Sequence, residues 1–320
     1  MKNKSIYYSV GALLYCPANN ESIVKSIISE RFGKLYSLAL CLEDTIGDEH
    51  VEEAEEILIH SLNSICEHMN KQPFYLPKIF IRVRKASQIQ DLVNRLGIAV
   101  ELLTGFIIPK ITIDNLDSYI EEIKAVNKDS RQPIYMLPIL ESTSIINLQN
   151  RHDILYAMKA KFDEIEELIL NIRVGGNDLC HAFGFRRSSY QSIHNIFPIA
   201  NIFSDIITIF GIDYVVSGPV WEYYRGDNWA EGLSAEIEQD LLSGFIGKTV
   251  IHPNQIEVVN EGLKVSREDY EDAKSIMNWD KKSNSYVSGN VEGKRMNEYK
   301  THMNWAEKIL FRAEIYGISN

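Results

Sequence analysis

The chain has 320 residues, a formal net charge of −11 and an isoelectric point near 5.3. This acidic balance argues against a nucleic-acid backbone or an anionic membrane as the main partner, because both attract excess Lys and Arg. No stretch approaches the roughly 18 unbroken apolar residues of a membrane span, and the amino-terminal apolar run is too short for a secretory signal. We therefore expect a cytoplasmic protein that contacts neither nucleic acid nor membrane.

Eight short apolar runs have the length and composition of strands, and a helical pattern follows each of them. The expected strands are residues 11–16, 37–42, 78–84, 103–110, 134–140, 168–172, 214–217 and 247–251. The clearest helices between them are residues 21–32, 49–70, 88–100 and 114–127. This alternation predicts an α/β fold, a (β/α)₈ TIM barrel with right-handed crossovers. An open doubly wound sheet is the rival fold, but the sequence has no GxGxxG or Walker motif to support it.

The chain changes character after the eighth strand. We expect a TIM-barrel domain over residues 1–265 and a C-terminal helical arm or lid over residues 266–320. Two helices, 266–280 and 296–316, flank a polar segment rich in Gly, Ser and Asn. The arm is expected to pack on a neighbouring subunit, since Trp279, Trp305 and Phe311 would otherwise expose much apolar surface.

The sixth strand ends in the sequence LILNIRVGGNDL, residues 168–179. Gly175 and Gly176 let the backbone turn sharply or let a ligand come close. They lead to Asn177 and Asp178 at the carboxyl end of the strand, where α/β folds place their chemistry. On this stretch alone, a helix cap and a ligand-binding residue are equally good interpretations of Asp178.

Charged residues follow the carboxyl ends of several expected strands. They are Glu43, Asp44, Arg82, Arg84, Lys110, Glu141, Asp178 and His252. Each has an ordinary explanation when taken singly: an acid can begin a helix, an arginine can pair with a structural acid, and a lysine can be solvated. Together they are harder to explain, because charges at one end of a barrel are costly unless they meet a metal ion or each other.

Glu141 and Asp178 lie on adjacent strands without a nearby histidine pair or thiolate cluster. Such carboxylates suit Mg²⁺, which takes one or two protein carboxylates and leaves its other positions to water and substrate oxygens. An adjacent arginine then suggests a substrate with a carboxylate, or with a carbonyl that becomes an enolate. Strand alternation places Arg82 and Arg84 on one interior face, with Arg82 deeper in the barrel.

The motifs that carry these residues form an ordered set. GALLYCPANNES, CLED, IRVR, IIPK, ILES, GGNDL, SGP and GKTVIHPNQ follow one another between Gly11 and Glu261. This set resembles the citrate lyase β-subunit/HpcH–HpaI aldolase superfamily of acyl-CoA and 2-oxo-acid carbon–carbon lyases. In overall appearance the chain is most similar to the citrate-lyase-like proteins encoded near tellurium-resistance gene clusters.

The resemblance implies a Mg²⁺-dependent carbon–carbon bond lyase or synthase, with Glu141 and Asp178 as metal ligands. Arg82 would bind the substrate carboxylate or carbonyl oxygen, and Glu43 and Asp44 would order metal-bound waters. The further candidates for substrate or cofactor binding are Lys110, Gly175, Gly176, His252 and Pro253. The expected partner is a small anionic metabolite or an acyl-CoA. The substrate can therefore include a CoA thioester. Relatives suggest a homotrimer.

The sequence also departs from the superfamily pattern. Cys41 replaces the first acid of the usual D-L-E-D, and Gly11 stands where many members have an arginine associated with CoA binding. Asn297, Glu298 and Tyr299 occupy the segment that in some relatives brings an aspartate to the neighbouring subunit's site. Two alternative functions therefore stay open. One is a non-catalytic or drifted metal- or anion-binding subunit of a biosynthetic or stress-response assembly, and the other is an acyl-CoA thioester hydrolase with Glu298 as its base.

Overall fold

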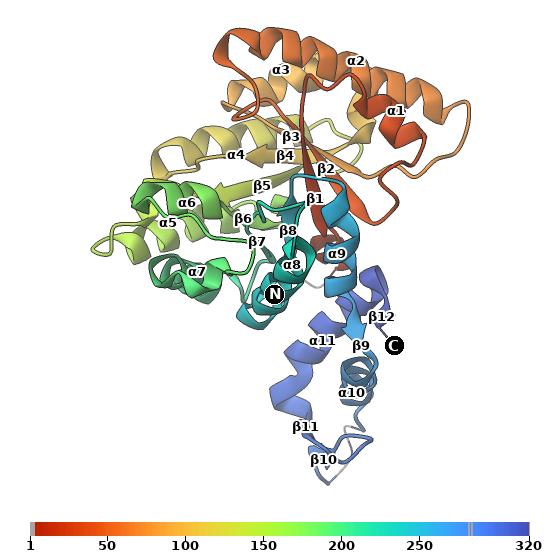
Figure 1. Cartoon of the computed structure of the whole chain (residues 1–320), viewed down its shortest axis with the longest axis vertical. Coiled ribbons are helices and arrows are strands. Elements are labelled where there is room, and N and C mark those ends of the chain that lie inside the picture. The colour runs from red at the N-terminus through yellow and green to blue at the C-terminus, as the bar shows by residue number, and fades with distance from the viewer. Residues whose placement is uncertain (1–3, 281, 283, 320) are drawn as a thin grey trace.

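The computed structural model describes residues 4–280, 282 and 284–319. Eight parallel strands pair in sequence order, and β1 pairs with β8 to close the barrel. The strands are β1 (Ala12–Pro17), β2 (Tyr36–Cys41), β3 (Lys78–Arg82), β4 (Leu103–Ile108), β5 (Tyr135–Leu140), β6 (Ile172–Val174), β7 (Val216–Gly218) and β8 (Phe245–Val250). The chain is therefore the TIM barrel that the sequence predicts (Figure 1).

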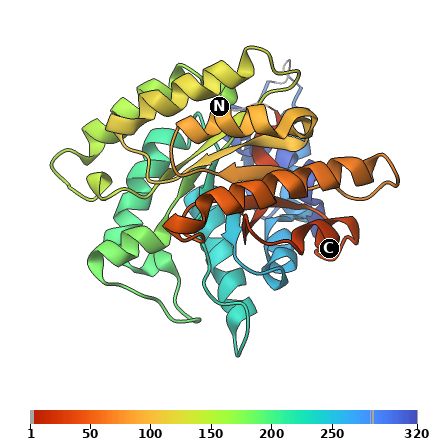
Figure 2. The ribbon, with the colours of Figure 1, turned by 90° about the horizontal axis from the view of Figure 1, so that it is seen from above.

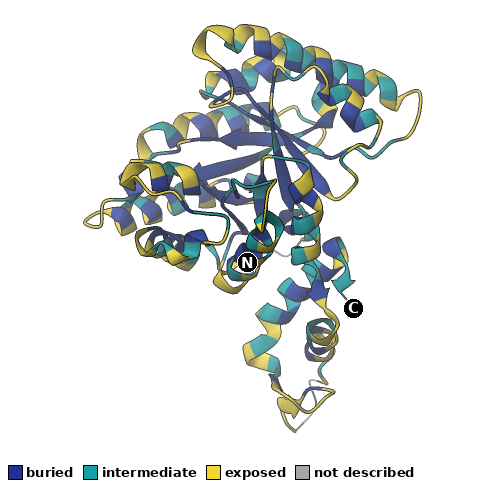
Figure 3. Cartoon of the chain, in the orientation of Figure 1, coloured by how far each residue is buried: buried dark blue, intermediate teal, exposed yellow. Residues whose placement is uncertain are grey.

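Helices surround the barrel, as the view from above shows (Figure 2). They are α1 (Ile23–Ile28), α2 (Val51–Met69), α3 (Ser87–Leu96), α4 (Ile113–Asn127), α5 (Arg151–Asp163), α6 (Gly176–Phe183), α7 (Phe197–Phe210), α8 (Trp229–Ser243) and α9 (Asn254–Leu263). Their apolar faces pack on the strands and their polar faces meet solvent, so the strands are buried while the outer helix faces are exposed (Figure 3). None of the helices among the described residues is long and apolar enough to cross a membrane.

Two apolar clusters result from the alternation of side chains along each strand. The larger one fills the space between strands and helices. The smaller one fills the barrel interior, where Leu13, Phe80 and Ile139 meet. The short 3₁₀ helix η1 (Ser5–Tyr8) covers the amino end of this interior, because its Tyr8 is buried in the same cluster. The amino end of the interior is therefore closed by η1.

The sixth strand begins later than the sequence predicts. Residues Glu166–Leu168 form the 3₁₀ helix η5, and Ile169 makes only an isolated bridge with Met136. The paired strand is Ile172–Val174, so the expected run 168–172 is displaced toward the carboxyl end. This displacement places Arg173 inside the strand.

The C-terminal arm projects away from the barrel (Figure 1). Its helices α10 (Arg267–Met277) and α11 (Tyr299–Tyr316) pack together around a small apolar cluster. Two small sheets are present that the helical interpretation missed: β9 (Val265–Ser266) with β12 (Ile318–Ser319), and β10 (Val287–Gly289) with β11 (Met296–Glu298). The expected domains 1–265 and 266–320 include residues 1–3, 281, 283 and 320, which lie outside the described part of the chain.

The arm is attached at the amino end of the barrel. Phe311 of α11 stacks on Tyr8 with ring centroids 5.1 Å apart, and the Tyr316 hydroxyl donates a hydrogen bond to the Tyr8 carbonyl at 2.5 Å. Gly11 explains part of this docking, because it has φ +59° and a Cβ there would lie 3.1 Å from the Tyr316 hydroxyl oxygen. Gly11 is the position at which the resemblance expects a CoA-binding arginine. It lies at the amino end of the barrel, where it packs against Tyr316.

Candidate active site

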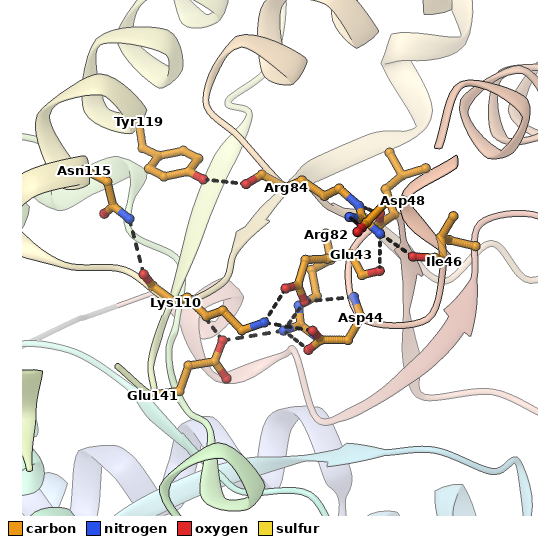
Figure 4. A network of polar contacts seen from close by, with 11 residues as sticks. Glu43, Asp44, Ile46, Asp48, Arg82, Arg84, Lys110, Asn115, Tyr119 and Glu141 are labelled. Carbon is orange, nitrogen blue, oxygen red and sulfur yellow. Dashed lines mark hydrogen bonds and ion pairs between the residues drawn. The ribbon is translucent and has the colours of Figure 1, made fainter. Parts of the chain in front are cut away.

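The loop after β2 carries Glu43 and Asp44, and Arg84 fixes its shape. The Arg84 Nε donates to the Leu42 carbonyl at 2.6 Å, its Nη2 donates to the Glu43 carbonyl at 3.0 Å, and its Nη1 pairs with Asp48 at 2.5 Å. Arg84 follows the end of β3 rather than lying in it. The expectation that it shares an interior face with Arg82 is therefore wrong, because its guanidinium turns to the loop carbonyls (Figure 4).

Arg82 is the last residue of β3 and is 7% exposed. Its Nη2 pairs with Glu43 Oε2 at 2.7 Å and Asp44 Oδ2 at 3.0 Å, and lies 3.5 Å from Glu141 Oε1. Its Nε is buried without an acceptor among the described residues. Arg82 thus joins the acids that follow β2 to the acid that follows β5.

Lys110 follows β4 and completes the network (Figure 4). Its backbone has φ +48°, a left-handed conformation that is unusual for a lysine. In this conformation its N–H donates to Glu141 Oε1 at 2.9 Å, while its Nζ pairs with Glu43 Oε1 at 2.6 Å and Asp44 Oδ1 at 2.8 Å. Burial raises the pKa of Asp44, but hydrogen bonds with Glu43 and Lys110 and the charge of Arg82 outweigh it and lower that pKa to about 2.

Glu141 and Asp178 supply two carboxylates beside this network. Glu141 follows β5 and is buried, whereas Asp178 lies in the first turn of α6. Burial raises the pKa of Glu141 to about 7; the charge of Arg82 opposes this shift and the charge of Asp178 adds to it. Asp178 has no hydrogen-bond or ion-pair partner within residues 4–280, 282 and 284–319. Asp178 therefore has no cation partner among the described residues, and Glu141 shares Arg82 with Glu43 and Asp44.

These residues fit a magnesium ion. The described residues contain no group of three or more His, Cys, Asp and Glu side chains that could hold a metal ion. Mg²⁺ does not require such a group, because it commonly binds through one or two carboxylates and keeps several waters. Glu141 and Asp178 are the residues that would hold it.

The two glycines after β6 have packing reasons for being glycine. A Cβ on Gly175 would lie 2.2 Å from Glu141 Oε2, and a Cβ on Gly176 would lie 2.6 Å from Ile193 Cδ1 and 2.7 Å from Pro219 Cβ. Gly175 thus lets the β6–α6 turn approach the Glu141 carboxylate. Gly176 lets α6 pack on its neighbours.

Among the described residues, neither His252 nor Pro253 contacts the charged network. His252 stacks on Tyr224 with ring centroids 4.5 Å apart, and its Nδ1 accepts a hydrogen bond from the Asn254 N–H at 3.1 Å. Pro253 is the N-cap of α9. Both residues remain candidates for contacts with the outer part of a substrate.

The lysine of GKTVIHPNQ has a structural role that sequence analysis did not assign. Lys248 turns away from the barrel interior, and its Nζ pairs with Glu236 at 3.0 Å and Asp240 at 2.6 Å on α8. Gly247 allows this with φ +91° and a register irregularity between β7 and β8. This motif therefore also ties α8 to the barrel.

Three polar residues inside the barrel were missed from the sequence: Tyr15, Arg173 and Thr249. Arg173 is 1% exposed, and its Nη2 donates to Thr249 Oγ1 at 2.6 Å. The Arg82 guanidinium lies 5.7 Å from the centroid of the Tyr15 ring. The available signal was a lone arginine within an otherwise apolar strand, where a charged residue needs an explanation.

The family model for carbon–carbon bond lyases of the TIM-barrel fold matches residues 4–318. The chain belongs to this family. A comparison with curated proteins finds no match. The tellurium-associated subgroup is a finer assignment that this match does not reach.

Solved structures share the fold at low sequence identity. CitE of Mycobacterium tuberculosis in complex with magnesium, acetoacetate and coenzyme A has a TM-score of 0.62 and 18% identity, and the alignment covers 96% of this chain and 99% of that one. A citrate lyase of Burkholderia xenovorans has a TM-score of 0.70 and 14% identity, with 97% and 93% covered. The M. tuberculosis citrate lyase β subunit with oxaloacetate and magnesium has a TM-score of 0.51 and 16% identity, with 81% and 99% covered. These likenesses extend over the arm as well as the barrel in the first two cases.

Proposed function

We propose that this lyase is a Mg²⁺-dependent enzyme that breaks or forms a carbon–carbon bond through an enolate, on an acyl-CoA or 2-oxo-acid substrate. The observation that carries this proposal is the pair Glu141 and Asp178. The two carboxylates lie together at the strand ends, Asp178 has no partner among the described residues, and the nearest cation to Glu141 is Arg82 at 3.5 Å. A divalent cation would balance both.

The residues of the network then have separate roles. Mg²⁺, when bound, would act as a Lewis acid on a substrate oxygen. Arg82 would hold a substrate carboxylate or carbonyl oxygen and stabilise negative charge that develops there, because its guanidinium is planar and permanently charged. Glu43 and Asp44 would order water at the barrel mouth, the open end formed by the carboxyl ends of the strands. Lys110 forms ion pairs with both of them.

The relatives support the substrate class without deciding it. The M. tuberculosis structures contain acetoacetate with coenzyme A in one case and oxaloacetate in another. Acetoacetate and oxaloacetate are small oxo-acids, and Arg82 together with a divalent cation held by Glu141 and Asp178 would suit such anions. The tellurium-associated subgroup, a cytoplasmic location and a trimeric state are part of the same proposal.

Calorimetry with Mg²⁺ tests the metal site directly. Glu141→Gln and Asp178→Asn keep the shape of each side chain and remove its charge, so each should weaken Mg²⁺ binding by about tenfold or more without unfolding the protein. Asp205→Asn is a matched control, because Asp205 pairs with Arg151 on the outer helices. Equal Mg²⁺ affinity in all three variants and the parent would remove the ligand assignment.

A second candidate, a metal- or anion-binding subunit without catalysis, is favoured by one observation. Arg82 and Lys110 are both already paired with Glu43 and Asp44, so Arg82 is engaged in ion pairs instead of being free to stabilise an enolate oxygen. Crystals soaked with Mg²⁺ and a panel of oxo-acids and acyl-CoA esters, assayed in parallel for cleavage, separate the two functions. Bound ligand without any cleavage would select the binding subunit.

A further inference from the structure

Arg173 is a buried cation with no counter-ion among the described residues. It lies in β6, beside Ile139 of β5 and Ser217 of β7, and is 1% exposed. Its polar contacts are Thr249 Oγ1 at 2.6 Å and Asn171 Oδ1 at 3.2 Å, and its Nε has no acceptor. No carboxylate pairs with it in the part of the chain that the structure describes.

Such an arrangement is costly and needs a reason. A guanidinium stays protonated in proteins, so burial cannot neutralise it as it would a lysine. Lys248, one residue before Thr249, shows that this chain can pair a buried cation with two acids. Arg173 has no such pairing, which indicates that its charge acts on another group.

The phenol of Tyr15 is one group on which the charge of Arg173 acts. Tyr15 lies on β1 two residues after the fully buried Leu13, and its ring packs on the interior cluster. Unlike Leu13 it is partly exposed. Tyr15 is the fourth of the six residues of β1, and its ring lies near Arg82 at the end of β3, so it lies toward the carboxyl ends of the strands.

Two guanidinium groups act on Tyr15. Arg82 is 5.7 Å from its ring centroid. Arg173 reaches Thr249, the register partner of Leu13 two residues before Tyr15, and its charge acts on the phenol. Burial raises the pKa of Tyr15 more than the charges of Arg82 and Arg173 lower it, so the hydroxyl keeps its proton at neutral pH.

We propose that Tyr15 is a catalytic residue that gives its hydroxyl proton to the enolate carbon, and that Arg173 is the positioning residue that orients Tyr15. In this step the Tyr15 O–H bond breaks and a C–H bond forms from the enolate electron pair, which restores the carbonyl. The oxygen of Tyr15 keeps its bonding pair as a phenolate, which the charges of Arg82 and Arg173 stabilise. Solvent water at the mouth then returns a proton. In the reverse direction the phenolate removes a proton from the same carbon.

This inference rests on the enolate chemistry of the proposed function. The test therefore uses an enolisation assay: loss of methyl protons from pyruvate, acetoacetate or acetyl-CoA in D₂O with Mg²⁺, followed by proton NMR. Tyr15→Phe should slow exchange by about 10²-fold at saturating probe, the lower range for a lost acid–base group. Tyr135→Phe is the matched control, because Tyr135 packs on the same interior cluster at the start of β5. It should exchange at the parent rate.

Arg173→Met tests the positioning role. In 3-fluorotyrosine-labelled protein, the Tyr15 resonance is identified by its absence in Tyr15→Phe, and it should shift in Arg173→Met. Methyl exchange should fall in this variant while the melting temperature stays level or rises, since an unpaired buried charge has been removed. A structural arginine would instead lower the melting temperature and leave the Tyr15 resonance in place, which overturns the positioning role.

The outcomes separate the two proposals. If the parent exchanges methyl protons and Tyr15→Phe matches it, Tyr15 is not the donor and the proposed function stands. If the parent exchanges none of the three probes, the enolate chemistry and its proton donor both fail. Slow exchange in Tyr15→Phe with normal exchange in Tyr135→Phe supports the donor.

Discussion

Arg82 has two interpretations that one substitution can separate. Its guanidinium contacts Glu43, Asp44 and Glu141, so it can serve either the reaction or the stability of the barrel mouth. Arg82→Lys keeps the charge but loses the planar fork that can grip two oxygens. If Arg82 stabilises the enolate, turnover should fall by on the order of 10²–10³ with little change in Mg²⁺ affinity or melting temperature.

The measurement needs turnover and thermal unfolding on the same variant. Lys110→Arg serves as a comparison, because it alters the other cation that forms ion pairs with Glu43 and Asp44. An Arg82→Lys protein that melts earlier but keeps full turnover in its folded fraction would remove Arg82 from the catalytic residues.

Glu141 predicts an unusual pH dependence for the metal-free protein. Its folded pKa is about 7, above the ordinary value of 4.5. The folded state therefore keeps a proton that the unfolded state has released, and stability should fall as pH rises from about 4.5 to 7. Denaturant unfolding in EDTA should show this decline, and Glu141→Gln should flatten it. If the parent protein instead becomes more stable than Glu141→Gln as pH rises over this range, the raised pKa of Glu141 is contradicted.

The turn between β6 and α6 holds one carboxylate close to the backbone. A Cβ on Gly175 would overlap Glu141 Oε2 at 2.2 Å. Gly175→Ala should therefore displace Glu141, weaken Mg²⁺ binding by about 10- to 100-fold and cost roughly 1–3 kcal/mol of stability. Gly47→Ala is the control, since its Cβ would meet only His50 Cδ2 at an ordinary 3.6 Å. Calorimetry measures the Mg²⁺ affinity of both variants, and denaturant unfolding measures their stability. Unchanged Mg²⁺ affinity in Gly175→Ala would mean that the ion binds elsewhere.

At the level of elements, the sequence predicts most of the barrel, because its strands and helices differ clearly in apolar period and length. It fails where tertiary contacts decide the local structure. The run beginning at Leu168 is apolar enough for a strand, yet η5 ends there and the continuous strand begins only at Ile172. Lys248 leaves the interior only because Gly247 adopts a left-handed conformation, which no period reveals.

The sequence also predicts which charged side chains come together. Glu43, Asp44, Arg82, Lys110 and Glu141 meet as the strand ends imply, since parallel strands converge on one face. Arg84 was misplaced, because alternation holds only within the strand and β3 ends at Arg82. Tyr15 was missed because an aromatic residue in an apolar strand has no distinguishing pattern before its neighbours are known.

The whole molecule places the arm and the charged network at opposite ends of the barrel. The arm docks on η1 through Phe311 and Tyr316, whereas the network lies at the carboxyl ends of the strands. An arm acting as a lid would therefore have to cover the site of another protomer.

The apolar surface of the arm differs from that expected from its sequence. Trp279, Trp305 and Phe311 are each partly buried within the chain. The exposed apolar side chains lie instead toward the tip of the arm, where Val287 is 48% exposed and Met296 is 55% exposed. These residues replace the tryptophans as the basis for an expected contact between subunits.

The last prediction concerns assembly. If the arm packs on a neighbouring protomer, the parent should sediment as a trimer at micromolar concentration, and Val287→Glu combined with Met296→Glu should dissociate it. Burying two carboxylates in an apolar contact is costly, whereas the same charges are tolerated on a free arm. Leu242→Glu on α8 is the control, because Leu242 is 89% exposed on the barrel itself and should not alter the sedimentation coefficient. Circular dichroism would check that each variant remains folded. A parent that sediments as a stable monomer would contradict subunit contact through the arm, and with it any lid function, since the arm cannot reach the network of its own chain.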